Sequence, residues 1–284
     1  MSDPQRTLRD VAVIKGVGVF TGGDITVEIH PAPTDHGPSF ELVREGRIFP
    51  IPVSVENILE TENRTALADL HNPDRQVNIV EHVLGTLHGM GVDNAVIRVD
   101  AAEIPLVDGS AAPFIEAVEK AGIVEQDAPR REIVIERPLF IDDNGLLLVL
   151  PSDALRLTYY LDHPTDIVGK RLAQIEVTPE TFRRRIGPAR TFIKSEKADD
   201  LLATGAVRYT DRSQVIVVGR DSISQPLRFA DEFCYHKMLD ILGDLFLTGR
   251  RIRAHIIGIR SGHYQNRKMA RKIAQEYLRV PGSG

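Results

Sequence analysis

The chain contains 284 residues, of which 42% are hydrophobic, and its formal net charge at pH 7 is -5. This length allows one or two domains with a buried core. Lys and Arg residues are spread along an acidic chain, so the composition lacks a nucleic-acid-binding signature. A basic run at residues 183–185 is more typical of a solvated turn, with contact to a membrane face or a phosphate as the alternative.

The sequence also bears on the compartment. Cys234 is the single cysteine, which excludes an intramolecular disulfide and suits a reducing environment. No apolar stretch approaches the ~20 residues that span a bilayer, and residues 1–6 lack the apolar core of a signal peptide. We therefore expect a cytoplasmic protein without a transmembrane segment. We further expect a monomer, with peripheral membrane contact left open.

Hydrophobic alternation and chain breakers predict the elements of the N-terminal half. Asp24–Ile29 alternates cleanly, which predicts a strand that ends near Pro31. A short helix is expected over Asn78–Gly89, followed directly by a strand at Ala95–Val99. Pro113–Gly122 has a proline near its start and a glycine at its end, an asymmetry typical of a helix.

A polar segment with a proline, residues 125–131, predicts a domain boundary that divides the chain into domains 1–127 and 128–284. The elements predicted after it are strands at 132–136, 146–150, 155–159, 214–218 and 253–259, helices at 230–244 and from about 267, and a loop at 261–266. Both halves run strands, helix, strand, helix. This order predicts an α+β fold with two similar domains, each a mostly antiparallel sheet with helices on one face.

The helix predicted at Ala230–Asp244 carries the most informative pattern. His236 and Asp240 are four residues apart, so they share a helix face. An imidazole and a carboxylate at this spacing can reach one metal ion, and Asp244 on the same line can hold a further histidine. In the alternative interpretation these side chains and Lys237 form the solvated face opposite a broad apolar face.

The helix predicted at Asn78–Gly89 offers a third ligand and a base. Asn78 is a good N-cap and Glu81 stands at the capping-box position, so a structural role is one interpretation. In the functional interpretation His82 completes a His2Asp site with an open position for water, and Glu81 takes the proton from that water. His263, in the loop predicted after a strand, is either a candidate acid or an ordinary turn residue.

Eight segments together point to a family. They are residues 16–22, 61–67, 80–82, 91–94, 103–114, 189–192, 231–244 and 262–263. In this order and at these separations they resemble the zinc-dependent UDP-3-O-acyl-N-acetylglucosamine deacetylases of lipid A synthesis, over most of the chain. The resemblance implies a duplicated fold packed helix layer to helix layer. It also implies a Zn2+ cofactor and an acylated UDP-amino-sugar substrate, from which acetate is hydrolysed to leave a free amine.

The resemblance further implies roles for individual residues. His82, His236 and Asp240 match the family's zinc ligands. Glu81 matches its general base, and His263 matches its general acid, which is charged in the working enzyme. These residue types suit a metal that polarises an amide carbonyl and activates water, with a second group that protonates the leaving amine.

Four more positions match the family. Asp244 matches the carboxylate that orients the acid histidine, and Thr191 matches a residue that stabilises the tetrahedral oxyanion. Lys237 and Phe192 match positions that contact substrate. Without the resemblance, Thr191 has the alternative of a strand-end hydroxyl bonded to backbone, and Lys237 that of a solvated helix charge.

Three departures from the family pattern leave alternatives open. Phe20 stands where the family has a histidine, residues 205–213 replace a Gly-Gly-Ser-like turn, and Tyr264 and Gln265 replace Ala-Leu. Residues 205–213 correspond to the region that forms the acyl-chain passage in the family, so a preference for acyl length is not carried over. The alternatives are a divergent zinc deacetylase acting on a related N-acyl amino sugar, and a non-catalytic binding relative.

Overall fold

Two five-stranded sheets with the same topology frame the protein, whose computed structural model describes residues 3–165, 167–205, 207 and 214–278. The first sheet contains β2 (Ala12–Val17), β3 (Asp24–Pro31), β4 (Pro38–Arg44), β5 (Arg47–Pro52) and β9 (Ala95–Val99), in the order β2-β3-β9-β4-β5. The second contains β12 (Leu139–Asp142), β13 (Leu146–Leu150), β14 (Arg156–Asp162), β15 (Lys170–Glu176) and β19 (His255–Ile259), in the order β12-β13-β19-β14-β15. In each, the central strand is antiparallel to one neighbour and parallel to the other.

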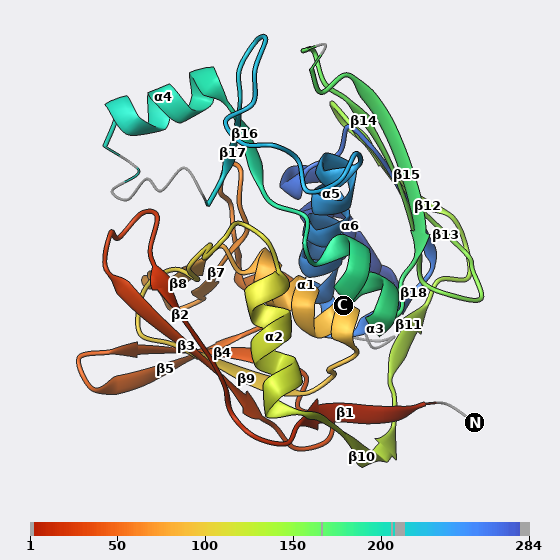
Figure 1. Ribbon diagram of the computed structural model, residues 1–284. Helices are drawn as coiled ribbons and strands as arrows, with labels where there is room; N and C mark the ends of the chain where they lie inside the picture. Colours follow the sequence, from red (N-terminus) through yellow and green to blue (C-terminus); the bar gives the residue numbers. More distant parts are fainter. Residues whose placement is uncertain (1–2, 166, 206, 208–213, 279–284) are drawn as a thin grey trace.

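The main helices of each half flank its central strand in the sequence. They are α1 (Glu81–Met90) and α2 (Ala112–Ala121) around β9, and α5 (Glu232–Leu245) and α6 (His263–Tyr277) around β19. Figure 1 shows these helices between the two sheets, with α1 beside α5. The predicted α+β fold with two similar domains, packed through their helices, is therefore confirmed. No described helix is long and apolar enough to cross a membrane.

Two glycines allow α1 and α5 to approach closely. A Cβ at Gly243 would overlap the backbone of Glu81, and a Cβ at Gly85 would press on Leu239. Glycine is destabilising inside a helix, and here its missing side chain provides the space for the partner helix. This contact brings the start of α1 against the middle of α5.

Shorter elements complete each half. Between β5 and α1 lie η1 (Val55–Asn57) and a small sheet of β6 (Ile58–Leu59), β7 (Ala66–Asp69) and β8 (Asn72–Asn78). Between β15 and α5 lie α3 (Pro179–Thr181), η2 (Phe182–Ile186), β16 (Phe192–Lys194), α4 (Ser195–Ala203) and β17 (Ile216–Val218). The short helix η3 (Phe246–Thr248) follows α5. β1 (Pro4–Leu8) pairs with β10 (Ile123–Pro129), and β11 (Glu132–Val134) pairs with β18 (Arg251–Arg253). The predicted boundary at residues 127 and 128 falls within β10 and stays a prediction.

Most predicted elements are present, and the main errors lie at helix starts. The single strand predicted at 253–259 is also wrong, because Arg253 ends β18 and β19 begins at His255. β9 and β13 have the predicted bounds. The expected cap at Asn78 is wrong, because Asn78 ends β8 and bonds Arg64 and Ala102 through its side chain. The expected loop at 261–266 is partly wrong, because α6 begins at His263. The basic run at 183–185 is exposed, as expected, but lies in a π-helical turn.

Candidate metal centre and active site

Three side chains from two helices meet at the α1–α5 contact. His82 comes from the first turn of α1, and His236 and Asp240 come from successive turns of α5. Their ligand atoms all lie within 4.8 Å of one another. The residues are 2%, 3% and 2% exposed, respectively, so the alternative of a solvated helix face is wrong.

The donor chemistry of these three residues fits a metal ion. His82 Nδ1 and Asp240 Oδ1 are buried and have no hydrogen-bond partner among the described residues, an arrangement that costs free energy unless something pairs with them. His236 Nδ1 bonds the carbonyl of Ala189 at 3.1 Å, which leaves Nε2 available, 3.5 Å from Asp240 Oδ1. Burial lowers the pKa of His82 to about 3 and also lowers that of His236, so both imidazoles are neutral, as ligation requires. Histidine and aspartate both bind zinc, and three protein ligands with a fourth position left open are the pattern of catalytic zinc sites.

Lys237 lies against the carboxylate of the candidate ligand Asp240 instead of in solvent. Its Nζ is 2.6 Å from Asp240 Oδ2, and its side chain is 16% exposed. Burial alone raises the pKa of Asp240, but Lys237 and the neighbouring histidines outweigh this and hold that pKa well below its usual range. Asp240 therefore stays ionised, and the alternative of a solvated lysine is wrong.

Glu81 is a buried carboxylate beside the three candidate ligands. It is the first residue of α1 and 4% exposed, and burial raises its pKa to about 7 despite the nearby His263. Its Oε2 accepts a hydrogen bond from the backbone N–H of Thr65 at 3.1 Å, and its Oε1 lies 3.9 Å from His263 Nε2. The N-cap of α1 is Val80, so the capping-box interpretation of Glu81 is wrong.

His263 begins α6 and points its Nδ1 at Asp244. The Nδ1–Oδ2 distance is 2.8 Å, and because an ionised carboxylate only accepts, Nδ1 carries the proton. Burial alone lowers the pKa of His263, but Asp244, Asp240 and Glu81 outweigh it and raise the pKa to about 9. At neutral pH the imidazole is therefore charged and can donate from Nε2.

Two residues of this site were missed in the sequence. The Thr65 hydroxyl donates to Asp244 Oδ1 at 2.5 Å, and Asn266 Nδ2 donates to Oδ2 at 2.9 Å. Both lie in or beside segments that carry the family resemblance. Asp244 is 0% exposed, and a buried carboxylate needs hydrogen-bond donors. Its burial therefore implies that donor residues surround it, but the sequence does not identify them.

Thr191 and Phe192 lie on the segment that leads into β16. The Thr191 backbone N–H donates to the carbonyl of Gly109 at 2.7 Å, while its hydroxyl bonds no described residue. The alternative of a hydroxyl bonded to backbone is therefore wrong. The Phe192 ring centroid lies 4.6 Å from that of Phe233 and 6.2 Å from that of His236, which puts it beside the metal-ligand group.

Comparison with known proteins agrees with this geometry. The family model for UDP-3-O-acyl N-acetylglycosamine deacetylase matches residues 5–275. The chain belongs to this deacetylase family. It is therefore an enzyme, a hydrolase.

Three relatives from this deacetylase family align with the chain over nearly all of its length and over most of their own. A UDP-3-O-acyl-N-acetylglucosamine deacetylase of Myxococcus xanthus is 34% identical over 96% of this chain and 87% of its own length. The corresponding protein of Thermosynechococcus vestitus is 34% identical over 96% and 94%, and that of Cellvibrio japonicus is 34% identical over 96% and 90%.

The structure shows the surroundings of Phe20, Tyr264 and Gln265, three residues that depart from the deacetylase family pattern. The Arg64 guanidinium lies 4.5 Å above the centre of the Phe20 ring, and the Phe20 backbone N–H donates to the carboxylate of Glu103. Tyr264 is 46% exposed, and Gln265 accepts a hydrogen bond from the Gly262 N–H at the start of α6. The altered turn at 205–213 lies mostly outside the described residues.

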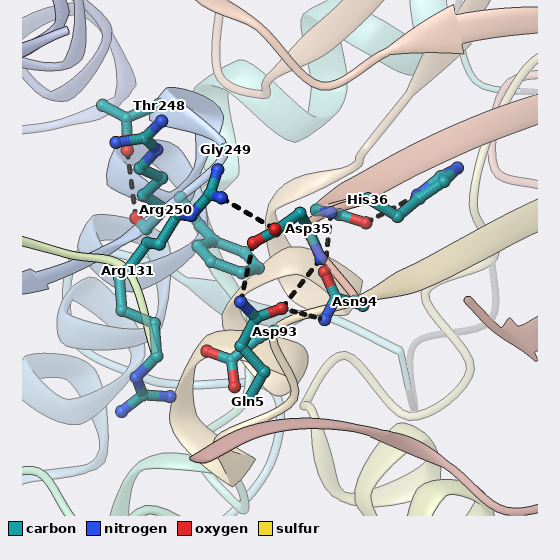
Figure 2. A pocket seen from close by; sticks show the side chains of 12 residues that line it. Gln5, Asp35, His36, Asp93, Asn94, Arg131, Thr248, Gly249 and Arg250 are labelled. Carbon is teal, nitrogen blue, oxygen red and sulfur yellow. Dashed lines mark hydrogen bonds and ion pairs between the residues drawn. The ribbon is translucent and has the colours of Figure 1, made fainter. Parts of the chain in front are cut away.

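Figure 2 shows a separate cavity, lined by other residues. Its volume is about 220 Å³, and it is lined by Gln5, Asp35, His36, Gly37, Asp93, Asn94, Arg131, Phe246, Thr248, Gly249, Arg250 and Arg251. Asp35 is paired with Arg131 at 2.7 Å, and Asp93 with Arg130 at 3.1 Å. None of the predicted site residues lines this cavity, so it is not the candidate active site of this deacetylase family member.

Proposed function

We propose that this enzyme hydrolyses the N-acetyl group of UDP-3-O-(3-hydroxyacyl)-N-acetylglucosamine, releasing acetate and a free amine for lipid A synthesis, with Zn2+ held by His82, His236 and Asp240. The observation that carries the proposal is the buried ligand group with a base and a charged acid beside it, in a chain of this family. The names of the relatives, UDP-3-O-acyl-N-acetylglucosamine deacetylase, support the same substrate.

In the proposed mechanism the protein's own groups move the protons. When bound, the zinc ion polarises the amide carbonyl and makes water more acidic. Glu81 accepts the proton of the attacking water, because burial has raised its basicity while leaving its Oε1 oriented toward the site. His263 then donates from Nε2 to the departing amine nitrogen, while Asp244 holds the Nδ1 proton and stabilises the cation.

Three further residues orient the substrate in this proposal. The Thr191 hydroxyl has no partner among the described residues and is free to donate to the oxyanion that forms at the carbonyl. Phe192 and Lys237 lie beside the metal ligands and contact the substrate. The monomeric state, the cytoplasmic location and any peripheral membrane contact stay predictions.

A second candidate is supported by the surroundings of Phe20. The Phe20 ring lies beneath Arg64 and replaces the histidine that the family has at this position. The loss of a titratable group there favours a related N-acyl amino sugar as the substrate. A panel of nucleotide-linked and free N-acyl amino sugars separates the two candidates by kcat/KM.

The deciding assay is acetate release from UDP-3-O-(3-hydroxyacyl)-N-acetylglucosamine by zinc-loaded protein, with Glu81→Ala as the control. We expect turnover by the native protein and its loss in the control. If zinc-loaded native protein released no acetate under conditions where a relative does, the proposed substrate would be wrong, and Phe20→His would be the next variant to assay.

A further inference from the structure

Thr65 contacts both halves of the proposed acid–base pair. It is 0% exposed and lies in the loop between β6 and β7, two strands of the small sheet inserted in the N-terminal half. Its backbone N–H donates to Glu81, and its hydroxyl donates to Asp244. One residue thus bonds a carboxylate from α1 and a carboxylate from α5.

The hydroxyl bond determines which oxygen of Asp244 remains for the histidine. Oδ1 accepts from Thr65, while Oδ2 accepts from His263 Nδ1 at 2.8 Å and from Asn266 Nδ2 at 2.9 Å. With both oxygens occupied, the carboxylate is fixed in one rotation, and the imidazole that it binds is fixed with it. Hydrogen bonds to an ionised acceptor are among the stronger ones in proteins.

The backbone bond has the same effect on the base. Because Glu81 Oε2 is bonded to the Thr65 N–H, Oε1 is the oxygen left toward His263, 3.9 Å from Nε2. The carbonyl of Thr65 in turn accepts from the N–H of Val80, directly before α1. The position of Thr65 therefore determines the spacing between the two groups that exchange protons with substrate.

The loop that carries Thr65 is itself held by the C-terminal half. Arg267 on α6 is 2% exposed and donates to the carbonyls of Arg64 and Thr61, each at 2.9 Å. The Thr61 hydroxyl also donates to the Arg64 carbonyl at 2.7 Å. The loop is thus anchored to the helix that begins with His263.

We propose that Thr65 is a positioning residue that fixes the geometry between Glu81 and the His263–Asp244 pair through its backbone N–H and its hydroxyl. This inference rests on the proposed function for its catalytic consequence. The geometric part concerns the orientation of Asp244 and His263 and can be tested without turnover.

The variant Thr65→Val removes the hydroxyl and keeps the shape and the backbone N–H, so the bond to Asp244 and the 3.4 Å contact with His263 Nδ1 are lost while the bond to Glu81 stays. We expect kcat to fall by roughly 10- to 100-fold, the effect typical of residues that orient a metal-site group, with KM and bound zinc unchanged. Thr65→Ser restores a hydroxyl and should recover most of kcat. The matched control is Thr7→Val, which removes another buried hydroxyl. That hydroxyl bonds the backbone of Asn94 and Ala32, and neither is a candidate site residue.

In the measurements of turnover and zinc content, three outcomes overturn the inference: kcat of Thr65→Val equal to that of Thr7→Val, a loss of zinc that accounts for the loss of turnover, or no recovery with Thr65→Ser. A crystal structure of Thr65→Val gives a readout independent of activity, and we expect the Asp244 carboxylate to rotate and the His263 ring to move with it. An unchanged Asp244–His263 geometry refutes the inference. If native protein has no turnover but the rotation is seen, the proposed function fails and the positioning role stands.

Discussion

At the scale of single residues, the two proposed proton-transfer groups have pKa values shifted upward for different reasons. Burial raises the pKa of Glu81 to about 7, while negative neighbours raise that of His263 to about 9 after burial has lowered it. Between these values the carboxylate is ionised and the imidazolium is charged. That combination suits a base and an acid that act in sequence.

We therefore expect a bell-shaped dependence of kcat/KM on pH. Activity rises as Glu81 loses its proton with a pKa near 7, and falls as His263 loses its proton with a pKa near 9. Rates measured between about pH 5 and pH 10 check this. In His263→Gln the alkaline limb should disappear along with most of the turnover; an alkaline limb that persisted would assign it to another group.

Variants of a proposed ligand and of the proposed acid should differ in the amount of zinc they bind. His236→Ala should lower both bound zinc and turnover, because it removes a ligand atom from the buried group. His263→Ala should lower turnover far more than zinc, since its imidazole bonds Asp244 and is not one of the three proposed ligands. Metal analysis of both purified variants is the measurement. Unchanged zinc in His236→Ala would show that the ligand assignment is wrong.

At the scale of elements, the close α1–α5 contact assembles the site. Glu81 and His82 lie in the first turn of α1, and the two proposed ligands on α5 can meet them only if the helices approach closely. Glycines at positions 85 and 243 make that approach sterically possible. Helical periodicity predicted both helices but contained no information about which face of one meets the other.

Gly243→Ala should therefore disturb both stability and metal binding. The new methyl group would overlap the backbone of Glu81, so the helices must separate, and overpacking of this kind costs roughly 1–3 kcal/mol. We expect a lower unfolding temperature and weaker zinc affinity. Gly23→Ala is the control, because its Cβ would meet nothing within 4 Å; equal behaviour of the two variants would contradict the packing argument.

The start of α6 illustrates why helix ends were harder to predict. The turn residues at 261–266 favoured a loop, yet the helix begins at His263. Gln265 accepts from the Gly262 N–H with its side chain, which satisfies a backbone donor at the helix start. Its own amide donates to the carbonyl of Asp143, on the turn between β12 and β13. That second bond spans 122 residues of sequence, beyond the reach of local pattern analysis.

At the scale of the whole molecule, residues of both halves form one site. Glu81, His82 and Thr65 come from the N-terminal half, while α5, α6 and the segment leading into β16 supply the remaining groups. Arg267 fastens the loop before β7 to α6, and its guanidinium satisfies two backbone carbonyls away from bulk solvent.

Arg267→Leu should loosen this connection. The Thr61 carbonyl loses its side-chain donor, while the Arg64 carbonyl keeps the Thr61 hydroxyl. Leaving one buried carbonyl without a donor costs roughly 1–3 kcal/mol of the free energy of unfolding, which denaturant titration measures. The control is Arg137→Leu, which removes an ion pair with Glu276 of α6. Because the Arg137 side chain is 71% exposed, we expect little change in the free energy of unfolding. A similar loss in both variants would argue against the anchoring role of Arg267.

The sequence by itself determined the helix that carries His236 and Asp240, the central strands, the duplicated order of elements and the family, because these depend on local periodicity and on ordered motifs. The tertiary structure alone decided that Lys237 pairs with the buried Asp240, that Asn78 is not the N-cap of α1, and that Thr65 bonds both Glu81 and Asp244. The physical reason is distance along the chain: the Thr65–Asp244 bond joins residues 179 positions apart. Contacts of that kind exist only after two sheets and their helices have packed.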